Sequence, residues 1–157
     1  MTVGIVIPAF NEAQNLSSVL SAVRKVDGIN CIIVVDDGST DATFHIAERH
    51  AERDGRVLVI RLPENRGKAG AMLVGVQALS TDLVIFLDAD LIGLQPFHIT
   101  KLHTPLKDGS YEMAIATFTR GGLLTDASHR VFPNFTGQRC LRRLDAEQAL
   151  IPLANTR

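Results

Sequence analysis

The sequence has little of what marks a secreted, membrane-spanning or nucleic-acid-binding protein. Its 157 residues include no tryptophan, one tyrosine and two cysteines, Cys31 and Cys140, which lie far apart. Two distant cysteines give neither a disulfide framework nor metal-ligand spacing, so we expect small buried thiols in a reducing compartment. The net charge of -1 gives no indication of a nucleic-acid or membrane-surface partner.

Long hydrophobic runs are also absent. The apolar N-terminal stretch "TVGIVIPAF" has no basic region before it and meets a proline and charged positions too soon for a signal peptide or a membrane span. The five histidines show no ligand spacing. We therefore expect a soluble, cytoplasmic protein without an integral membrane segment, and the sequence leaves open whether it forms a homo-oligomer.

What the sequence does contain is an alternation of strand-like and helix-like segments. Short β-branched runs predict strands at residues 3–7, 31–35, 57–62, 83–87 and 113–118. Helical spacing predicts helices at residues 16–26, 41–54, 72–79, from 96 onward, and at 138–150. Strands that are apolar on both faces, each followed by an amphipathic helix, indicate an α/β fold with a mostly parallel sheet covered on both sides.

Polar residues follow several of these strands directly. The fourth strand ends in "VIFLDADLIG", which places Asp88 and Asp90 two residues apart after a hydrophobic segment. Asp37 follows the second strand, and Asn11 and Glu12 follow the first. Ligands of open parallel sheets bind beyond the carboxyl ends of the strands, so we expect these side chains to meet at one edge. A hard cation such as Mg²⁺ or Mn²⁺, shared with substrate phosphates, suits such a group of carboxylates.

Each motif taken alone has a simpler interpretation. Asp37 and Asp41 can be turn and capping residues, with Ser39 or Thr40 as a helix N-cap. Lys68 in "NRGKAGAM" can be a solvated side chain, or it can reach a phosphate beside glycine N–H groups. The occurrence of four such stretches at strand ends in one βα series favours a ligand site.

The four stretches "IPAFNE", "VVDDGSTD", "NRGKAGAM" and "FLDADL", in this order, resemble the nucleotide-sugar-binding half of a family 2-type glycosyltransferase with the GT-A fold. The resemblance covers about residues 3–95. It implies a metal-dependent enzyme that moves a sugar from a UDP- or GDP-type donor to an acceptor. Within one domain, residues 1–157, it implies a nucleotide-sugar-binding half (about 1–95) and a partial acceptor half (about 96–157).

The resemblance also implies roles for particular residues. Asp88 and Asp90 are the catalytic pair, with Asp90 as the metal ligand and Asp88 nearer the ribose or sugar. The residues implied in nucleotide-sugar binding are Pro8, Ala9, Asn11, Glu12, Asp37, Lys68, Asp88 and Ala89.

The second half resembles the acceptor region of glucosyl-3-phosphoglycerate synthase-type enzymes. In these, a Gly-Gly-x-x-Thr loop, matched here by Gly121, Gly122 and Thr125, binds the acceptor's phosphate. Leu123 departs from the basic residue of that type, so the acceptor stays unknown, with a phosphorylated small molecule as one candidate. The simpler interpretation is that Gly121 and Gly122 form a turn. Arg139, Arg142 and Arg143 either face acceptor or belong to a solvated helix face.

The family usually continues beyond this length, so we expect a C-terminally truncated domain. Two other functions remain open from the sequence. One is a non-catalytic nucleotide-sugar-binding module or fragment. The other, more distant, is a haloacid-dehalogenase-like phosphatase, which also carries an Asp-x-Asp after a strand but needs Thr or Val where this chain has Ile92.

Overall fold

The computed structural model of the chain describes residues 1–109, 111–115 and 138–155. Within them one mixed sheet has the strand order β3-β2-β1-β4-β6-β5. Its strands are β1 (Val3–Ala9), β2 (Cys31–Asp36), β3 (Val57–Arg61), β4 (Leu83–Phe86), β5 (Met113–Ile115) and β6 (Arg139–Arg142). The helices are α1 (Leu16–Val23), α2 (Thr43–Ala51), α3 (Gly67–Ala78), α4 (Pro96–Lys107) and α6 (Arg143–Ala154).

The first four strands are parallel, and their composition explains why. β1, β2 and β4 are continuous apolar runs whose residues are almost all buried, as expected for strands covered on both faces. β1 pairs in parallel with β2 on one side and with β4 on the other, and β2 pairs in parallel with β3. The predicted α/β fold with a mostly parallel sheet is confirmed.

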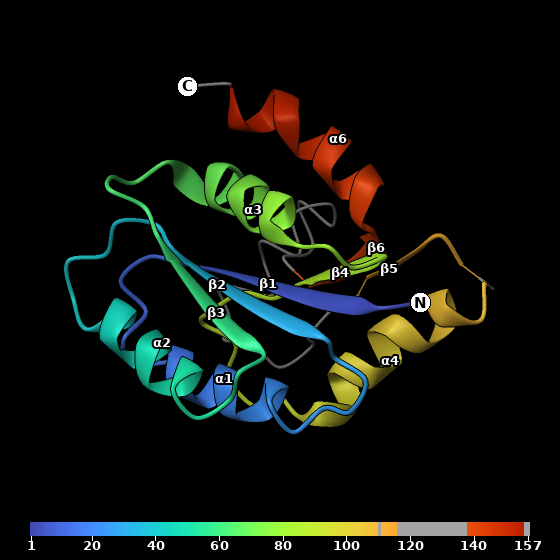
Figure 1. The fold of residues 1–157 in the computed structure, drawn as a ribbon, viewed down its shortest axis with the longest axis horizontal. Coiled ribbons are helices and arrows are strands. Elements are labelled where there is room, and N and C mark those ends of the chain that lie inside the picture. Colours follow the sequence, from blue (N-terminus) through green and yellow to red (C-terminus); the bar gives the residue numbers. More distant parts are fainter. Residues whose placement is uncertain (110, 116–137, 156–157) are drawn as a thin grey trace, which may run out of the picture.

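Helices cover both faces of the sheet, so the molecule has three layers. Figure 1 shows α1, α2 and α4 on one side of the strands and α3 and α6 on the other. Each face has its own apolar cluster. One contains Ile5, Leu16 and Ile99, and the other contains Val6 and Val76. Neighbouring residues of β1 therefore serve opposite layers, as strand geometry requires.

Gly75 sets the distance between α3 and the sheet. A Cβ atom at this position would lie 2.4 Å from Val6 Cγ1 and 3.2 Å from Val35 Cγ2. The helix backbone thus lies directly against β1 and β2, and only glycine fits there without displacing a strand residue.

The chain departs from the prediction after α4. The predicted helix at residues 138–150 is wrong in its first part, because β6 (Arg139–Arg142) pairs antiparallel with both β4 and β5. β6 lies between β4 and β5 in the sheet, and its Cys140 is fully buried while Arg142, at the end of the strand, is exposed. The helix α6 begins only at Arg143. The predicted strand at residues 113–118 is described from Met113 to Ile115 as β5.

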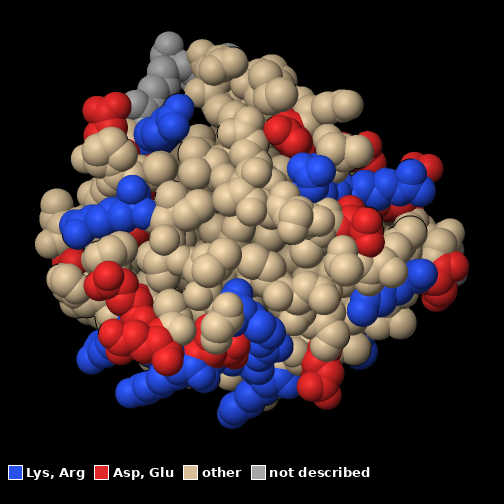
Figure 2. All heavy atoms as spheres, in the orientation of Figure 1, with Lys and Arg blue, Asp and Glu red and all other residues tan. Residues whose placement is uncertain are grey.

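The charged side chains on the surface are mixed in sign, in keeping with the net charge of -1 (Figure 2). Figure 2 shows acidic and basic side chains mixed along the rim of one face, with uncharged side chains across its middle. None of the described helices is both long and apolar enough to span a bilayer.

Candidate functional site

The carboxyl ends of β1, β2 and β4 lie side by side at one edge of the sheet, because these strands are adjacent and parallel. Asn11 and Glu12 follow β1, Asp37 follows β2, and Asp88 and Asp90 follow β4. The predicted gathering of polar side chains at this edge is therefore present. The hydrogen-bond partners of these side chains differ from one residue to the next.

Two loops at this edge are joined by reciprocal hydrogen bonds. Asn11 has a left-handed backbone (φ 55°), a conformation that asparagine tolerates better than most residues. Its N–H donates to Ser39 Oγ at 2.9 Å, and its Oδ1 accepts from Thr40 N–H at 2.9 Å. The Glu12 N–H donates to Thr43 Oγ1 at 2.8 Å. The β1–α1 and β2–α2 loops are thus fixed relative to each other before any ligand binds.

Asp41 also connects these two loops, and it takes the capping role that the sequence suggested for Ser39 or Thr40. Its Oδ1 accepts from the Thr43 N–H at 2.9 Å at the start of α2, and its Oδ2 accepts from the Ala13 N–H at 3.1 Å. Burial opposes a lower pKa for Asp41, but the hydrogen bonds from Thr43 and Ala13 outweigh it and lower that pKa. The capping interpretation therefore holds for Asp41.

The two aspartates that end β2 are buried and bound by the protein. Asp36 Oδ1 accepts from the Ser39 N–H at 3.3 Å. Its Oδ2 lies 3.3 Å from Arg61 Nε, which makes an ion pair but not a hydrogen bond. Asp37 is 3% exposed, and its Oδ1 accepts from the Arg66 N–H at 2.7 Å. Asp37 therefore holds the start of α3, a structural role in addition to the nucleoside contact that the resemblance implies.

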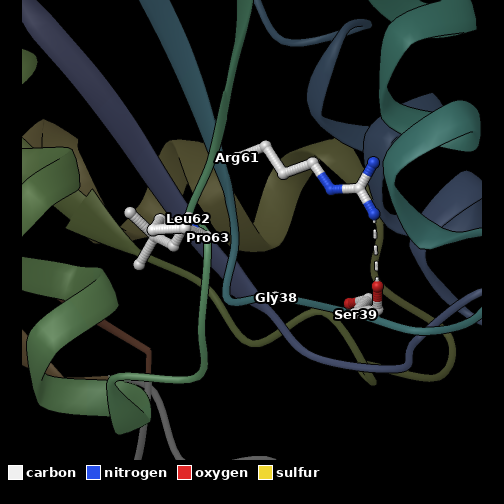
Figure 3. A pocket seen from close by; sticks show the side chains of 5 residues that line it. All are labelled: Gly38, Ser39, Arg61, Leu62 and Pro63. Carbon is white, nitrogen blue, oxygen red and sulfur yellow. Dashed lines mark hydrogen bonds between the residues drawn. The ribbon is translucent and has the colours of Figure 1, made fainter.

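A hollow of about 410 Å³ opens beside these residues. Its lining consists of Gly38, Ser39, Arg61, Leu62 and Pro63, from the ends of β2 and β3. In Figure 3 the Arg61 guanidinium reaches across to the Ser39 carbonyl, to which Nη2 donates at 3.4 Å, while Leu62 and Pro63 line the opposite side. The guanidinium carbon also lies 4.7 Å from the centre of the Phe44 ring. The hollow thus has an apolar wall and a cationic wall.

The two carboxylate oxygens of Asp88 accept hydrogen bonds from two different residues. The Lys68 ammonium, in the first turn of α3, donates to Asp88 Oδ1. The Gln138 amide, just before β6, donates to Asp88 Oδ2 at 3.0 Å. Lys68 is the predicted site residue, and the structure places it against Asp88. Sequence reasoning missed Gln138, which lies 50 residues away along the chain.

Asp90 is in the opposite situation. It is exposed, and within the described ranges it has no hydrogen bond or ion pair, while Ala89 between the two aspartates is buried. Among the described residues no group of three or more His, Cys, Asp or Glu is placed to hold a metal ion. The carboxylates of this edge are mostly engaged by protein donors and do not converge on one point. Asp90 fits a divalent cation that takes its remaining ligands from phosphate oxygens and water, as Mg²⁺ commonly does.

A family model described as glycosyl transferase family 2 matches residues 4–150. The chain belongs to this family. It is also 35% identical over 127 residues to glucosyl-3-phosphoglycerate synthase of Mycobacterium tuberculosis, covering 76% of this chain and 38% of that protein. Dolichol-phosphate mannosyltransferase of Pyrococcus furiosus is 35% identical over 125 residues, covering 78% of this chain and 35% of that protein.

A solved structure of the mycobacterial synthase, in complex with Mn²⁺, UDP-glucose and phosphoglyceric acid, has the same fold. It superimposes with a TM-score of 0.70 and 29% identity over 91% of this chain and 57% of that one. The GT-A fold of family 2 is thus confirmed for this chain. The chain spans between a third and two fifths of the length of the two relatives named above.

The acceptor side of this family 2 domain is described only in part. Gly121, Gly122 and Thr125 lie outside the described residues. Of the three arginines near β6, Arg143 belongs to the framework, because it donates to the Thr81 carbonyl at 3.2 Å and to Glu147 Oε2 at 3.2 Å. Arg139 Nε is buried and finds no hydrogen-bond partner in the described part of the chain.

Proposed function

We propose that this chain binds a nucleotide-diphosphate sugar of the UDP type together with a divalent cation, and that it transfers the sugar to an acceptor. One observation carries the proposal: a hollow beside Asp37 and the Asp88–Asp90 pair lie at the same edge of the sheet, separated by β1. Adjacent strands are about 4.8 Å apart, so β2 and β4 are about 10 Å apart. A nucleoside diphosphate bridges such a span, and a free monosaccharide does not.

The base and ribose belong at the β2 side. Pro8, Ala9, Asn11 and Glu12 form or adjoin the joined loops, and Asp37 supports the wall of the hollow. A flat base can lie between the apolar wall at Leu62 and the loop at Gly38. The UDP-glucose found with a family 2 relative of 29% identity supports a uridine donor.

The diphosphate and sugar belong at the β4 side. Asp88, with Ala89 packed beneath it, is placed to accept hydrogen bonds from ribose or sugar hydroxyls. Lys68 stands at the start of α3, where its ammonium can turn from Asp88 to a phosphate. Asp90 is exposed and would hold Mg²⁺ or Mn²⁺, which neutralises charge on a departing nucleoside diphosphate when bound.

The acceptor is the less defined part of the proposal. A phosphorylated small molecule is supported by the phosphoglyceric acid found with the mycobacterial relative. In β6, Arg139 has a buried Nε without a hydrogen-bond partner among the described residues, and it follows Gln138 beside the site, whereas Arg142 is exposed at the far end of the strand. We assign it to the acceptor's anionic group, with Gly121, Gly122 and Thr125 as further candidates. We further propose that the transferred sugar keeps its anomeric configuration, which the product anomer tests directly.

Calorimetric titration with UDP, GDP and UDP-glucose, each with and without Mn²⁺, tests the donor proposal. We expect UDP-glucose to bind more tightly when Mn²⁺ is present. Absence of binding by all three ligands would contradict the donor proposal. Incubation of the bound complex with 3-phosphoglycerate then tests transfer, and the anomer of the product is read by NMR.

A binding module without turnover is the second candidate, because the chain spans less than half of its curated relatives. Saturable, Mn²⁺-dependent binding of UDP-glucose, with neither transfer nor hydrolysis, would favour this module over the enzyme. Membership of family 2 removes the phosphatase alternative.

A further inference from the structure

Gln138 is a buried amide that contacts the Asp-x-Asp motif directly. It is 3% exposed, and its Nε2 donates a 3.0 Å hydrogen bond to Asp88 Oδ2. We propose that Gln138 is a positioning residue, which fixes the Asp88 carboxylate so that Oδ1 faces the nucleotide sugar. The inference rests on the proposed donor site and adds a residue from outside its four motifs.

The location of Gln138 is set by the sheet. β6 pairs antiparallel with β4, and Arg139 stands opposite Phe86. Gln138 directly precedes β6 and therefore lies beside the end of β4, next to the residues that lead into Asp88. Because the backbone of the adjacent Arg139 is fixed by its pairing with Phe86, the fold presents the Gln138 amide to Asp88.

The two donors to Asp88 differ in how easily they leave. Lys68 has a side chain that is 54% exposed, and ion pairs of that kind contribute little and exchange readily with water or other charges. Gln138 is buried, so breaking its hydrogen bond leaves polar atoms without water to replace the partner. An arriving nucleotide sugar is therefore expected to displace Lys68 from Asp88 Oδ1, while Gln138 keeps its hydrogen bond to Asp88 Oδ2.

The chemical type of the residue also fits this role. An amide is neutral, so it orients the carboxylate without cancelling its negative charge. Asp88 thus keeps its full capacity to accept from hydroxyl groups once Lys68 has moved. A lysine or arginine at position 138 would hold Asp88 in place and also neutralise it.

A double-mutant cycle tests the proposal. UDP-glucose affinity in the presence of Mn²⁺ is measured by calorimetry for the parent, Gln138→Leu, Asp88→Ala and the double variant. We expect Gln138→Leu to weaken binding by about tenfold. In the Asp88→Ala background the same change should have no further effect, because its only route to the ligand is gone. Gln148→Leu, on an exposed turn of α6, is the matched control and should bind like the parent.

Equal affinity of parent and Gln138→Leu would overturn the inference. So would an undiminished loss in the Asp88→Ala background, which would mean that Gln138 acts only through stability. If Gln138→Leu fails to fold, Gln138→Met replaces it, and the side-chain amide signal of Gln138 is followed by NMR in the parent. That signal should shift in Asp88→Ala and persist in Lys68→Met; the opposite pattern contradicts the inference. A parent that binds no nucleotide sugar contradicts the proposed function instead.

Discussion

Asp54 at the amino end of the sheet and the Asp88–Asp90 pair at its carboxyl end differ in how the protein holds them. At the amino end, Asp54 accepts from Arg24 Nε at 3.2 Å, from Arg56 Nη2 at 2.8 Å and from the Arg56 N–H at 3.1 Å. At the carboxyl end, Asp90 has no partner among the described residues, and Asp88 accepts from one exposed lysine and from one neutral amide. The Asp54 carboxylate is thus engaged by the fold, as are Asp36 and Asp37 at the carboxyl end, whereas Asp90 is exposed and has no partner among the described residues.

The difference shows in what the partners do. Arg56 also donates to the Arg24 carbonyl at 2.7 Å and to the Val26 carbonyl at 3.3 Å, so it ties the start of β3 to the loop after α1. Its hydrogen bond to Asp54 holds the pKa of Asp54 well below the usual range. Such a network is saturated and has no place for a ligand. The comparison teaches that a functional carboxylate is better identified by the donors around it than by its burial.

Asp54→Asn is expected to give the largest change in stability. It removes the charge that pairs with Arg24 and Arg56 and should lower the free energy of unfolding by about 1–3 kcal/mol. For a domain of this size that is a fall in melting temperature of roughly 3–10 °C. Thermal melts at pH 7 measure it. Asp145→Asn, in the first turn of α6, is the control and should lose less, about 0.3–1 kcal/mol, because it removes only an exposed charge near a helix N-terminus.

The same variant predicts a pH dependence. Because the pKa of Asp54 is lowered in the folded state, its stabilisation is present above the unfolded pKa of about 3.9 and is lost as pH falls through the folded value. The difference in melting temperature between parent and Asp54→Asn should be constant from pH 7 to about 5 and shrink below about 4. Buried His50, whose pKa is lowered by burial and by Arg24, destabilises both proteins alike on acidification. A difference that grew at low pH would refute this assignment.

Lys68→Met should change the melting temperature little, since an exposed ion pair contributes about 0–1 kcal/mol. It should nevertheless weaken the binding of UDP several-fold while leaving the affinity for uridine unchanged, because the Lys68 ammonium is proposed to contact the phosphates. Calorimetry with the two ligands separates these effects. Equal losses for uridine and UDP would place Lys68 at the nucleoside instead.

Asp90→Asn is expected to have the smallest effect on the ligand-free protein, within about 0.5 kcal/mol of the parent. Its carboxylate is exposed and has no partner in the described part of the chain, so removal costs the fold nothing and can relieve local repulsion. The Mn²⁺-dependent part of nucleotide binding should disappear. If Mn²⁺ strengthens nucleotide binding equally in parent and variant, Asp90 is not the ligand.

Much of the fold could be predicted because four strands carry an unambiguous pattern. β1, β2 and β4 are apolar on both faces, which is typical of parallel strands between helical layers. β6 has four residues, two of them arginine, and its pattern is compatible with the first turn of a helix. Pairing with β4 and β5 decides its conformation, and that pairing is not visible locally.

The site divides in the same way. The aspartates Asp37 and Asp88 stand out because each comes directly after an apolar strand, whereas Lys68 stands at the start of α3 after the β3–α3 loop. Gln138 could not be found, since a single glutamine 50 residues from Asp88 has no local signature. The binding of Asp37 to the Arg66 N–H was equally hidden, because it depends on how the β3–α3 loop returns to β2.

The close approach at Gly75 has a consequence for substrate range. Lys68 and Gly75 belong to one helix, seven residues and about 10 Å apart, and Gly75 holds that helix directly against Val6. The backbone of α3 is therefore fixed by packing near its middle, and Lys68 can change its position only by rotating its own side chain. A larger or smaller donor would have to be accommodated by replacing side chains at the rim, because the helix that carries the lysine cannot slide to meet it.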